Sequence, residues 1–303
     1  MNASVFDFLL TAEPDDAPGE DLAACWARHR ARSAGFANSV DRAAVAGFDS
    51  AETGSAFLGG YQEALHTLIP ELEPDDLAAL CATEAAGARP SAMTTAVAGD
   101  GTVTGTKSFA TLGPAATRFV VIATDGLRAD GRSSLRAVLV PATAPGITVT
   151  PLPELPFVPE VPHATVEFAA APGDVLPGDG YADYLKPFRT VEDMHVVAAV
   201  LGRLVRVGRQ ARWPVEPVAQ LLAVLAAVRG VSVEDPSSAG AHVALGGVFG
   251  LLTRARVELE PWWDQVDPVV RSRWERDSPV LGVAGKARAA RLTTAWRAVA
   301  GAE

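Results

Sequence analysis

The sequence has little cysteine and no concentration of basic residues, and both shortages limit what the protein can do. Cys25 and Cys81 are the only cysteines, lie far apart and belong to no Cys-x-x-Cys motif. Neither a disulfide framework nor a thiolate metal site is therefore predicted, and both thiols are expected to be reduced. Lys and Arg are scattered singly through a chain of net charge −10, so a nucleic-acid partner is not expected.

Long apolar runs and paired histidines are missing as well. No apolar run is long enough to cross a membrane, and residues 1–19 carry acids in place of the basic and apolar regions of a secretion signal. The expected location is the cytoplasm, with no membrane partner. No two histidines have the spacing of metal ligands on one helix, so no metal is expected; the histidines are His29, His66, His163, His195 and His242.

The two ends of the chain have helical patterns. Its 303 residues, 49% of them hydrophobic, allow a large core and two or three compact units. Residues 1–80 look helical, and Asp75 and Asp76 after Pro74 are expected to begin a further helix. Helical patterns return near residues 183–207, 215–228, 241–259 and 280–299. The clearest apolar stripe at helical spacing consists of Phe57, Leu58, Tyr61, Leu65 and Leu68.

The middle of the chain has the pattern of short strands. Residues 94–98 and 102–104 are β runs joined by the hairpin signal Asp100-Gly101. Further β-branched runs, separated by Gly and Pro, predict a small antiparallel barrel or sandwich; they are residues 118–124, 135–140, 147–150 and 164–168. The order of helices, strands and helices predicts an α+β chain with domains at 1–80, 81–178 and 179–303.

A compound motif in the middle region points to a family. It runs from Cys81-Ala82-Thr83-Glu84, with Gly87 behind it, through the hairpin and Gly105-Thr106-Lys107-Ser108-Phe109-Ala110-Thr111 to the strand Phe119-Val120-Val121-Ile122-Ala123. This pattern resembles the middle domain of the acyl-CoA dehydrogenases, in which Thr-Glu-Pro-x-x-Gly-Ser-Asp and Gly-x-Lys-x-Trp/Phe-Ile-Thr/Ser segments line the flavin of FAD. The resemblance covers roughly Ala56 to Gly301 and is strongest in the middle.

The resemblance implies an FAD-dependent oxidoreductase that desaturates an acyl thioester of CoA or a carrier protein. It implies N-terminal helices, a middle antiparallel β-barrel and a C-terminal helical bundle. Thr83 would meet the pyrimidine edge of the isoalloxazine, Phe109 would pack along the ring and Thr111 would offer its hydroxyl near N5. Arg212 stands where the family has an arginine that contacts the FAD of a neighbouring subunit. Taken singly, Phe109 and Thr111 would be ordinary strand residues.

Three departures from the family pattern limit what the resemblance carries over. Where the family pattern has Pro, Ser and Asp after Thr-Glu, this chain continues as Ala85-Ala86-Gly87-Ala88-Arg89-Pro90. The side-chain contact to the pyrophosphate region of FAD is therefore left open, and Ser91 is a candidate substitute. The N-terminal helical part is shortened, which leaves the substrate size open. The sequence ends at residue 303, near the point where the family continues into its last helices. Those helices usually carry the catalytic glutamate, which has no counterpart here.

A minority branch of the family has its base on the first C-terminal helix, before an Ala-Ala run that ends in Gly. Counting back from Gly202 selects Glu192, whereas counting back from Ala198-Ala199 selects Asp193. A carboxylate there could remove the α-proton of a thioester. The alternative is that both acids complement a helix macrodipole. His195, on an apolar helix, is expected to be a satisfied core residue.

Three alternative functions remain, because a fold does not determine which reaction a protein catalyses. The first is the desaturation described above. The second is a catalytically silent subunit that acts with another acyl-CoA dehydrogenase-like chain. The third is a flavin oxidase or monooxygenase on the same scaffold. The helices after Tyr184 are rich in Ala, Val and Leu, which predicts a homodimer or larger assembly.

Overall fold

The computed structural model describes residues 4–15 and 21–301 of the chain. It contains two compact units. The helical unit comprises Met1–Ala64, Pro156–Val158 and Thr190–Glu303, and the β unit comprises Leu65–Leu155 and Pro159–Arg189. The predicted order of helices, strands and helices is confirmed. The helices before and after the strands belong to the same unit.

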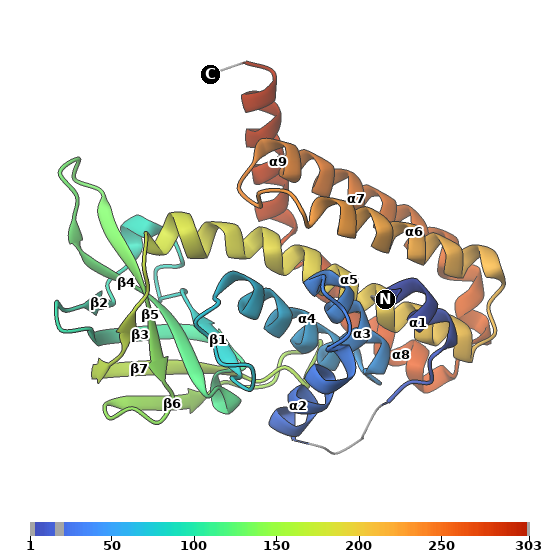
Figure 1. Ribbon diagram of the computed structural model, residues 1–303, viewed down its shortest axis with the longest axis horizontal. Coiled ribbons are helices and arrows are strands. Elements are labelled where there is room, and N and C mark those ends of the chain that lie inside the picture. Colours follow the sequence, from blue (N-terminus) through green and yellow to red (C-terminus); the bar gives the residue numbers. More distant parts are fainter. Residues whose placement is uncertain (1–3, 16–20, 302–303) are drawn as a thin grey trace. The chain divides into compact units, whose positions relative to one another are not determined.

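Helices make up both ends of the chain (Figure 1). Five of them begin at a Ser, Asp or Asn whose side chain accepts a hydrogen bond from a first-turn N–H. The helices are α1 Val5–Thr11, α2 Leu22–Ser33, α3 Ser39–Asp49, α4 Thr53–Leu68, α5 Lys186–Gln210, α6 Val215–Val231, α7 Ala239–Leu259, α8 Pro268–Asp277 and α9 Gly285–Val299. The predicted helices near 183–207, 215–228 and 241–259 are α5, α6 and α7. The one expected at 280–299 begins only at Gly285, and α8 was not predicted.

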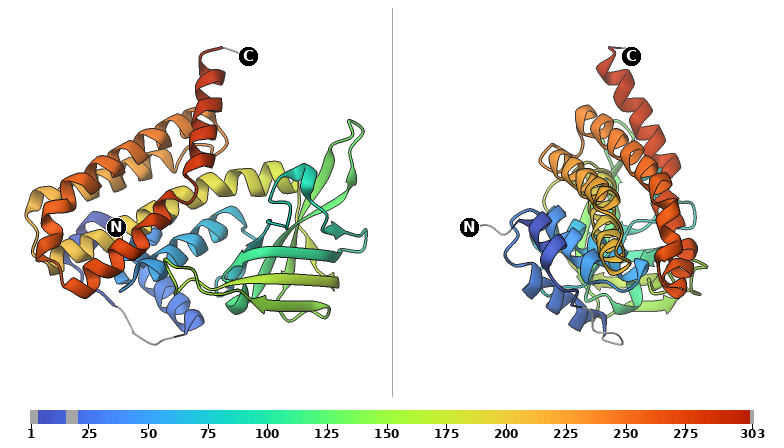
Figure 2. Two further views of the ribbon diagram at one scale, coloured as in Figure 1. Left: turned by 180° about the vertical axis from the view of Figure 1, so that it is seen from behind. Right: turned by 90° about the vertical axis from the view of Figure 1, so that its right-hand side faces the viewer.

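Two glycines allow α3 and α5 to touch backbone to backbone. A Cβ at Gly202 would lie 1.9 Å from the Ala44 carbonyl oxygen, and one at Gly47 would lie 1.7 Å from that of Ala199. Such distances are far inside van der Waals contact, so only glycine fits at either position. Later in the unit, α7 packs against both α6 and α9 (Figure 2).

The β unit is an eight-stranded sheet with the order β6-β7-β3-β2-β4-β5-β8, in which β1 pairs with β4. Within the described part of the chain, the end strands β6 and β8 do not pair with each other, so the sheet is an open, curled half-barrel (Figure 1). Most pairs are antiparallel as predicted, but β4 pairs in parallel with both β1 and β2. The strands are β1 Ala78–Cys81, β2 Ala96–Val97, β3 Thr102–Thr111, β4 Arg118–Leu127, β5 Ser133–Pro141, β6 Ile147–Pro151, β7 His163–Pro172 and β8 Asp174–Val175.

The strands enclose an apolar core on one face of the sheet. Phe119 and Phe168 meet edge to face there, with ring centroids 5.9 Å apart. Small and β-branched residues from β1 to β7 fill the remaining core. The alternation that predicted the strands is therefore the alternation between core and outer face.

The predicted hairpin is present at Asp100-Gly101, where Gly101 has φ +85° and the Ala98 N–H donates to the Thr102 carbonyl. The helix predicted to begin at Asp75 and Asp76 is wrong. The chain enters β1 instead, because the Asp76 carboxylate accepts hydrogen bonds from the Glu73 N–H and the Thr117 hydroxyl at the start of β4.

No helix within residues 4–15 and 21–301 is both long and apolar enough to cross a membrane.

Candidate functional site

A bulge in β3 turns Phe109 outward. Lys107 pairs with Val166 and Ala110 pairs with Ala164, so Ser108 and Phe109 together face a single residue of β7. Phe109 has φ +58°, a left-handed conformation that side chains of its size rarely adopt. Strain of this kind is concentrated at functional sites.

Phe109 forms an exposed aromatic surface beside Thr111. Its side chain is 48% exposed although it lies in the middle of the sheet. The buried ring of His163 supports it, with centroids 4.4 Å apart, and His163 is also the strand partner of Thr111. Burial lowers the pKa of His163 despite a backbone hydrogen bond at Val161, so the imidazole is neutral at pH 7. The surface is therefore flat, apolar and flanked by a hydroxyl.

The loop after β1 brings Thr83 to the same place. The Thr83 carbonyl accepts a hydrogen bond of 2.7 Å from the Ser108 N–H, at the bulge itself. A tight turn follows, in which Glu84 and Gly87 exchange backbone hydrogen bonds and Gly87 has φ +99°. The structure thus brings Thr83, Phe109 and Thr111 together in the β unit.

A buried ion pair holds this loop against β3. The Lys107 ammonium, fully buried, lies 2.8 Å from the Glu84 carboxylate, which also accepts hydrogen bonds from the Thr94 N–H and hydroxyl and the Thr95 N–H. Burial would raise the pKa of Glu84, but the hydrogen bonds from Lys107, Thr94 and Thr95 outweigh it and lower the pKa to about 2. Glu84 is therefore ionised at any physiological pH.

Cys81, at the end of β1, plays no nucleophilic part in this arrangement. Cys81 is a free thiol, and burial raises its pKa to about 12 although Lys107 opposes the shift. A thiol of that pKa is protonated and inert at neutral pH.

The two candidate bases lie on α5 in the helical unit, and they differ in burial. Asp193 is buried, accepts a hydrogen bond of 2.9 Å from Arg288 and forms a second ion pair with Arg291. Burial raises the pKa of Asp193, and the two arginines oppose that shift. Glu192 is half-buried at the next position.

Arg212 lies at the turn after α5. It is exposed and has φ +54°, which ends the helix. The next residue, Trp213, is buried, and its indole N–H donates to the Trp262 carbonyl at 3.0 Å. Trp263 is buried between the rings of Trp213 and Trp274.

The prediction that His195 is a satisfied core residue is confirmed. Its two ring nitrogens hydrogen-bond the Val191 carbonyl and the Ser39 hydroxyl, at 2.7 and 2.8 Å, and burial lowers its pKa. Within the described ranges, no three His, Cys, Asp or Glu side chains gather closely enough to hold a metal ion.

Sequence reasoning missed the roles of His163 and of the Glu84–Lys107 pair. One signal was available for the pair: Lys107 occupies an inward position of a strand that alternates between core and surface, and a buried lysine requires an anionic partner. No local pattern indicated His163, because its contact with Phe109 is made across strands that are distant in sequence.

Residues 79–171 match the family model described as "Acyl-CoA dehydrogenase, middle domain". This range contains β1, the bulge and the ion pair. No curated protein matches the sequence.

Solved structures resemble the chain over most of its length. Butyryl-CoA dehydrogenase from Megasphaera elsdenii is 16% identical to this chain, with a TM-score of 0.66; the alignment covers 85% of this chain and 81% of that protein. An acyl-CoA dehydrogenase from Geobacillus kaustophilus is 16% identical, with a TM-score of 0.65; the alignment covers 91% of this chain and 90% of that protein. TdsC from Paenibacillus sp. A11-2, in complex with FMN and indole, is 15% identical with a TM-score of 0.68, covering 97% and 94%. At these identities the likeness is one of fold.

Replacing Lys107 by Met tests whether the buried pair holds the β unit together. The variant leaves the Glu84 carboxylate buried without its cation, and we expect the free energy of unfolding to fall by about 3–5 kcal/mol. Chemical denaturation measures the free energy of unfolding of each variant. Lys186→Met, at an exposed lysine, is the control and should change stability by less than about 0.5 kcal/mol. The double variant E84Q/K107M should recover part of the loss. Equal stability of K107M and K186M would contradict a structural role for the pair.

Proposed function

We propose that this chain is a flavin-dependent oxidoreductase of the acyl-CoA dehydrogenase family that desaturates an acyl thioester, because residues 79–171 match the middle-domain model of that family and the fold is similar to that of acyl-CoA dehydrogenases. The observation that supports this proposal most strongly is the exposed Phe109, held in a strained bulge between Thr83 and Thr111 inside the matched domain. Its location is proposed to be the cytoplasm.

The proposed cofactor is FAD, held in part by Thr83, Phe109 and Thr111. These residues fit a flat heteroaromatic ring, because Phe109 offers an apolar face backed by the neutral His163, while the threonines offer hydrogen-bonding groups at its edges. When bound, a flavin supplies a two-electron acceptor for hydride. The chain's own part is to orient the ring and exclude water from one of its faces.

Glu192 is the proposed base, in preference to Asp193. Both oxygens of Asp193 accept hydrogen bonds from arginines, and taking up a proton would weaken two ion pairs in a buried place. Glu192 is on the same helix, one residue away and about 100° around its axis. Its longer side chain reaches further from the helix to take a proton from the α-carbon of a substrate.

A flavin monooxygenase or oxidase is the second candidate. TdsC, a dibenzothiophene monooxygenase, is similar in fold to 97% of this chain in its FMN-bound form. In that case the thioester is replaced by a small aromatic or nitrogen-containing substrate, and FMN can take the place of FAD.

Titration with flavin tests the cofactor assignment. The folded wild-type protein should bind FAD well below about 100 μM, and Phe109→Ala should weaken binding about 5-fold, since a stacked aromatic contributes about 1 kcal/mol. Flavin fluorescence provides the measurement. Leu127→Ala is the control, because Leu127 is 75% exposed on another strand of the same sheet. Tighter binding of FMN than FAD would favour the monooxygenase, and no binding of either would refute the flavin assignment and favour a silent subunit.

Substitution of the two acids tests the base. Glu192→Gln should lower turnover of an acyl-CoA substrate at least about 100-fold while leaving the flavin spectrum unchanged, because a positioned base contributes at least that factor. A series of acyl-CoA thioesters of increasing chain length identifies the substrate first. Asp193→Asn is the matched variant and should affect stability more than the rate. Near-wild-type turnover by both variants would exclude this mechanism.

The protein is proposed to assemble as a homodimer or a larger oligomer, or as a heteromer with a related chain. Large apolar side chains are exposed on α7 and α9, among them Val257 at 67%, Trp296 at 54% and Val299 at 60%. Apolar groups on this scale favour burial against another chain. Light scattering should give at least twice the monomer mass, and a monomer at every concentration would also remove the basis for a role of Arg212 at a neighbouring flavin.

A further inference from the structure

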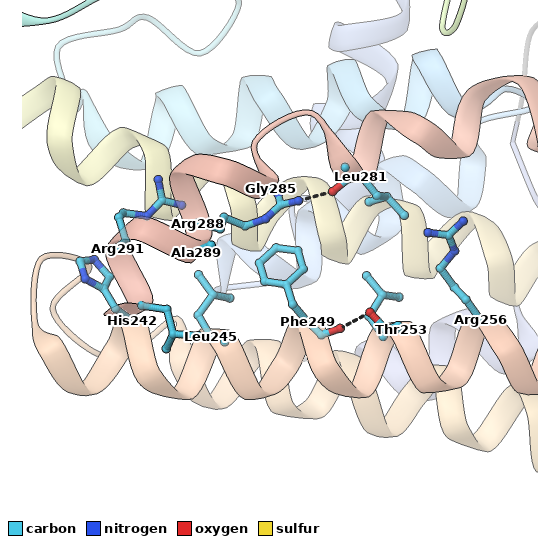
Figure 3. Close-up of a pocket in the computed structure, with 14 residues that line it drawn as sticks. His242, Leu245, Phe249, Thr253, Arg256, Leu281, Gly285, Arg288, Ala289 and Arg291 are labelled. Atoms are coloured by element: carbon cyan, nitrogen blue, oxygen red, sulfur yellow. Dashed lines mark hydrogen bonds between the residues drawn. The ribbon is translucent and has the colours of Figure 1, made fainter. Parts of the chain in front are cut away.

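A cavity of about 370 Å³ lies within the helical unit, between α7 and the segment formed by residues 278–282 and α9 (Figure 3). Its size falls in the range of small-molecule sites. His242 and Arg256 line it from α7 and stand fourteen residues apart, so the cavity follows about 20 Å of that helix. Its elongated outline suits a chain-like ligand.

The walls are apolar along the middle of the cavity. Phe249 projects into it from α7, and leucines line both sides. A Cβ at Gly285 would meet no atom within 4 Å, whereas at Gly246 a Cβ would lie 3.0 Å from the side chain of Leu292. The lining leucines are Leu245, Leu252, Leu281 and Leu292.

The charged groups of the cavity are all cationic. Arg256, Arg288 and Arg291 line it, and none of its lining residues is acidic. Asp193 pairs with both Arg288 and Arg291, which leaves an excess of positive charge. Arg288 also lies 4.1 Å from the centroid of the Phe249 ring and donates to the Leu281 carbonyl.

Arg256 differs from the other two arginines in its partners. Its guanidinium lies 5.6 Å from the Trp274 ring centroid, and no carboxylate of the described residues pairs with it. Its hydrogen-bond donors are therefore available to an anion, and a planar guanidinium matches a carboxylate with two parallel hydrogen bonds.

We propose that this cavity binds a monocarboxylate with an unbranched apolar chain, its carboxylate on Arg256 and its chain along Phe249 and the leucines. No lining residue is among those assigned to the cofactor or the base, although two lining arginines pair with Asp193.

Calorimetric titration of the full chain with decanoate tests the proposal. Gly285→Leu places a side chain in the cavity, at a position where a Cβ would meet no atom within 4 Å. Gly247→Leu is its control, because Gly247 is on α7, is equally open to a Cβ and does not line the cavity. Arg256→Met removes the guanidinium, and Arg254→Met removes an exposed arginine outside the cavity. Circular dichroism establishes that each variant is folded, and leucine favours a helix more than glycine does.

The wild type should bind decanoate with a Kd below about 1 mM. G285L and R256M should each weaken binding at least about 10-fold, as expected for a filled cavity and for a lost charge-assisted pair. G247L and R254M should stay within about 2-fold, and decanol should bind at least about 10-fold more weakly than decanoate. No binding, equal binding of decanol and decanoate, or unchanged affinity in G285L would each overturn the proposal.

Discussion

The buried ion pair between Glu84 and Lys107 is the constraint on which the candidate site depends. A lysine at an inward strand position is tolerated only with an anion, and Glu84 reaches it because the loop after β1 turns back at Gly87. The same turn brings the Thr83 carbonyl onto the Ser108 N–H. One electrostatic requirement therefore determines where the loop lies relative to the strand.

The bulge is the second consequence of that arrangement. Lys107 and Ala110 both face inward, so two residues must be accommodated between them on the outer side, and the left-handed conformation of Phe109 achieves this. The aromatic ring is then exposed rather than packed in the core. His163 supports it from the neighbouring strand. A strained backbone held by a buried ion pair would preorganise the surface that we propose for the flavin.

In the helical unit, two glycines fix the position of the helix that carries the candidate bases. Gly202 and Gly47 let α5 lie directly against α3, and this fixes the helix that carries Glu192 and Asp193. Asp193 is further fixed by two arginines of α9. These two arginines also line the cavity between α7 and α9, so the carboxylate and the cavity share their cations.

Local patterns predicted most of the strands and helices, because alternation and helical spacing are properties of neighbouring residues. The helix expected at Asp75 and Asp76 failed because Asp76 is bonded to Thr117, a partner forty-one residues later. The proximity of Thr83 to the bulge followed from the family resemblance rather than from spacing. The ion pairs of Asp193 could not be predicted, since Arg288 lies 95 residues away and nothing local selects it.

Hydrogen exchange measured by mass spectrometry, with and without saturating FAD, tests the central claim most directly. The account predicts that FAD slows exchange in residues 83–87 and 108–112, the loop and the bulge joined by Thr83 and Ser108. Strand β6, at the far edge of the sheet order, should be unchanged and serves as the internal control. Slowed exchange elsewhere with none in these two segments would contradict the claim that the bulge in β3 forms the flavin surface.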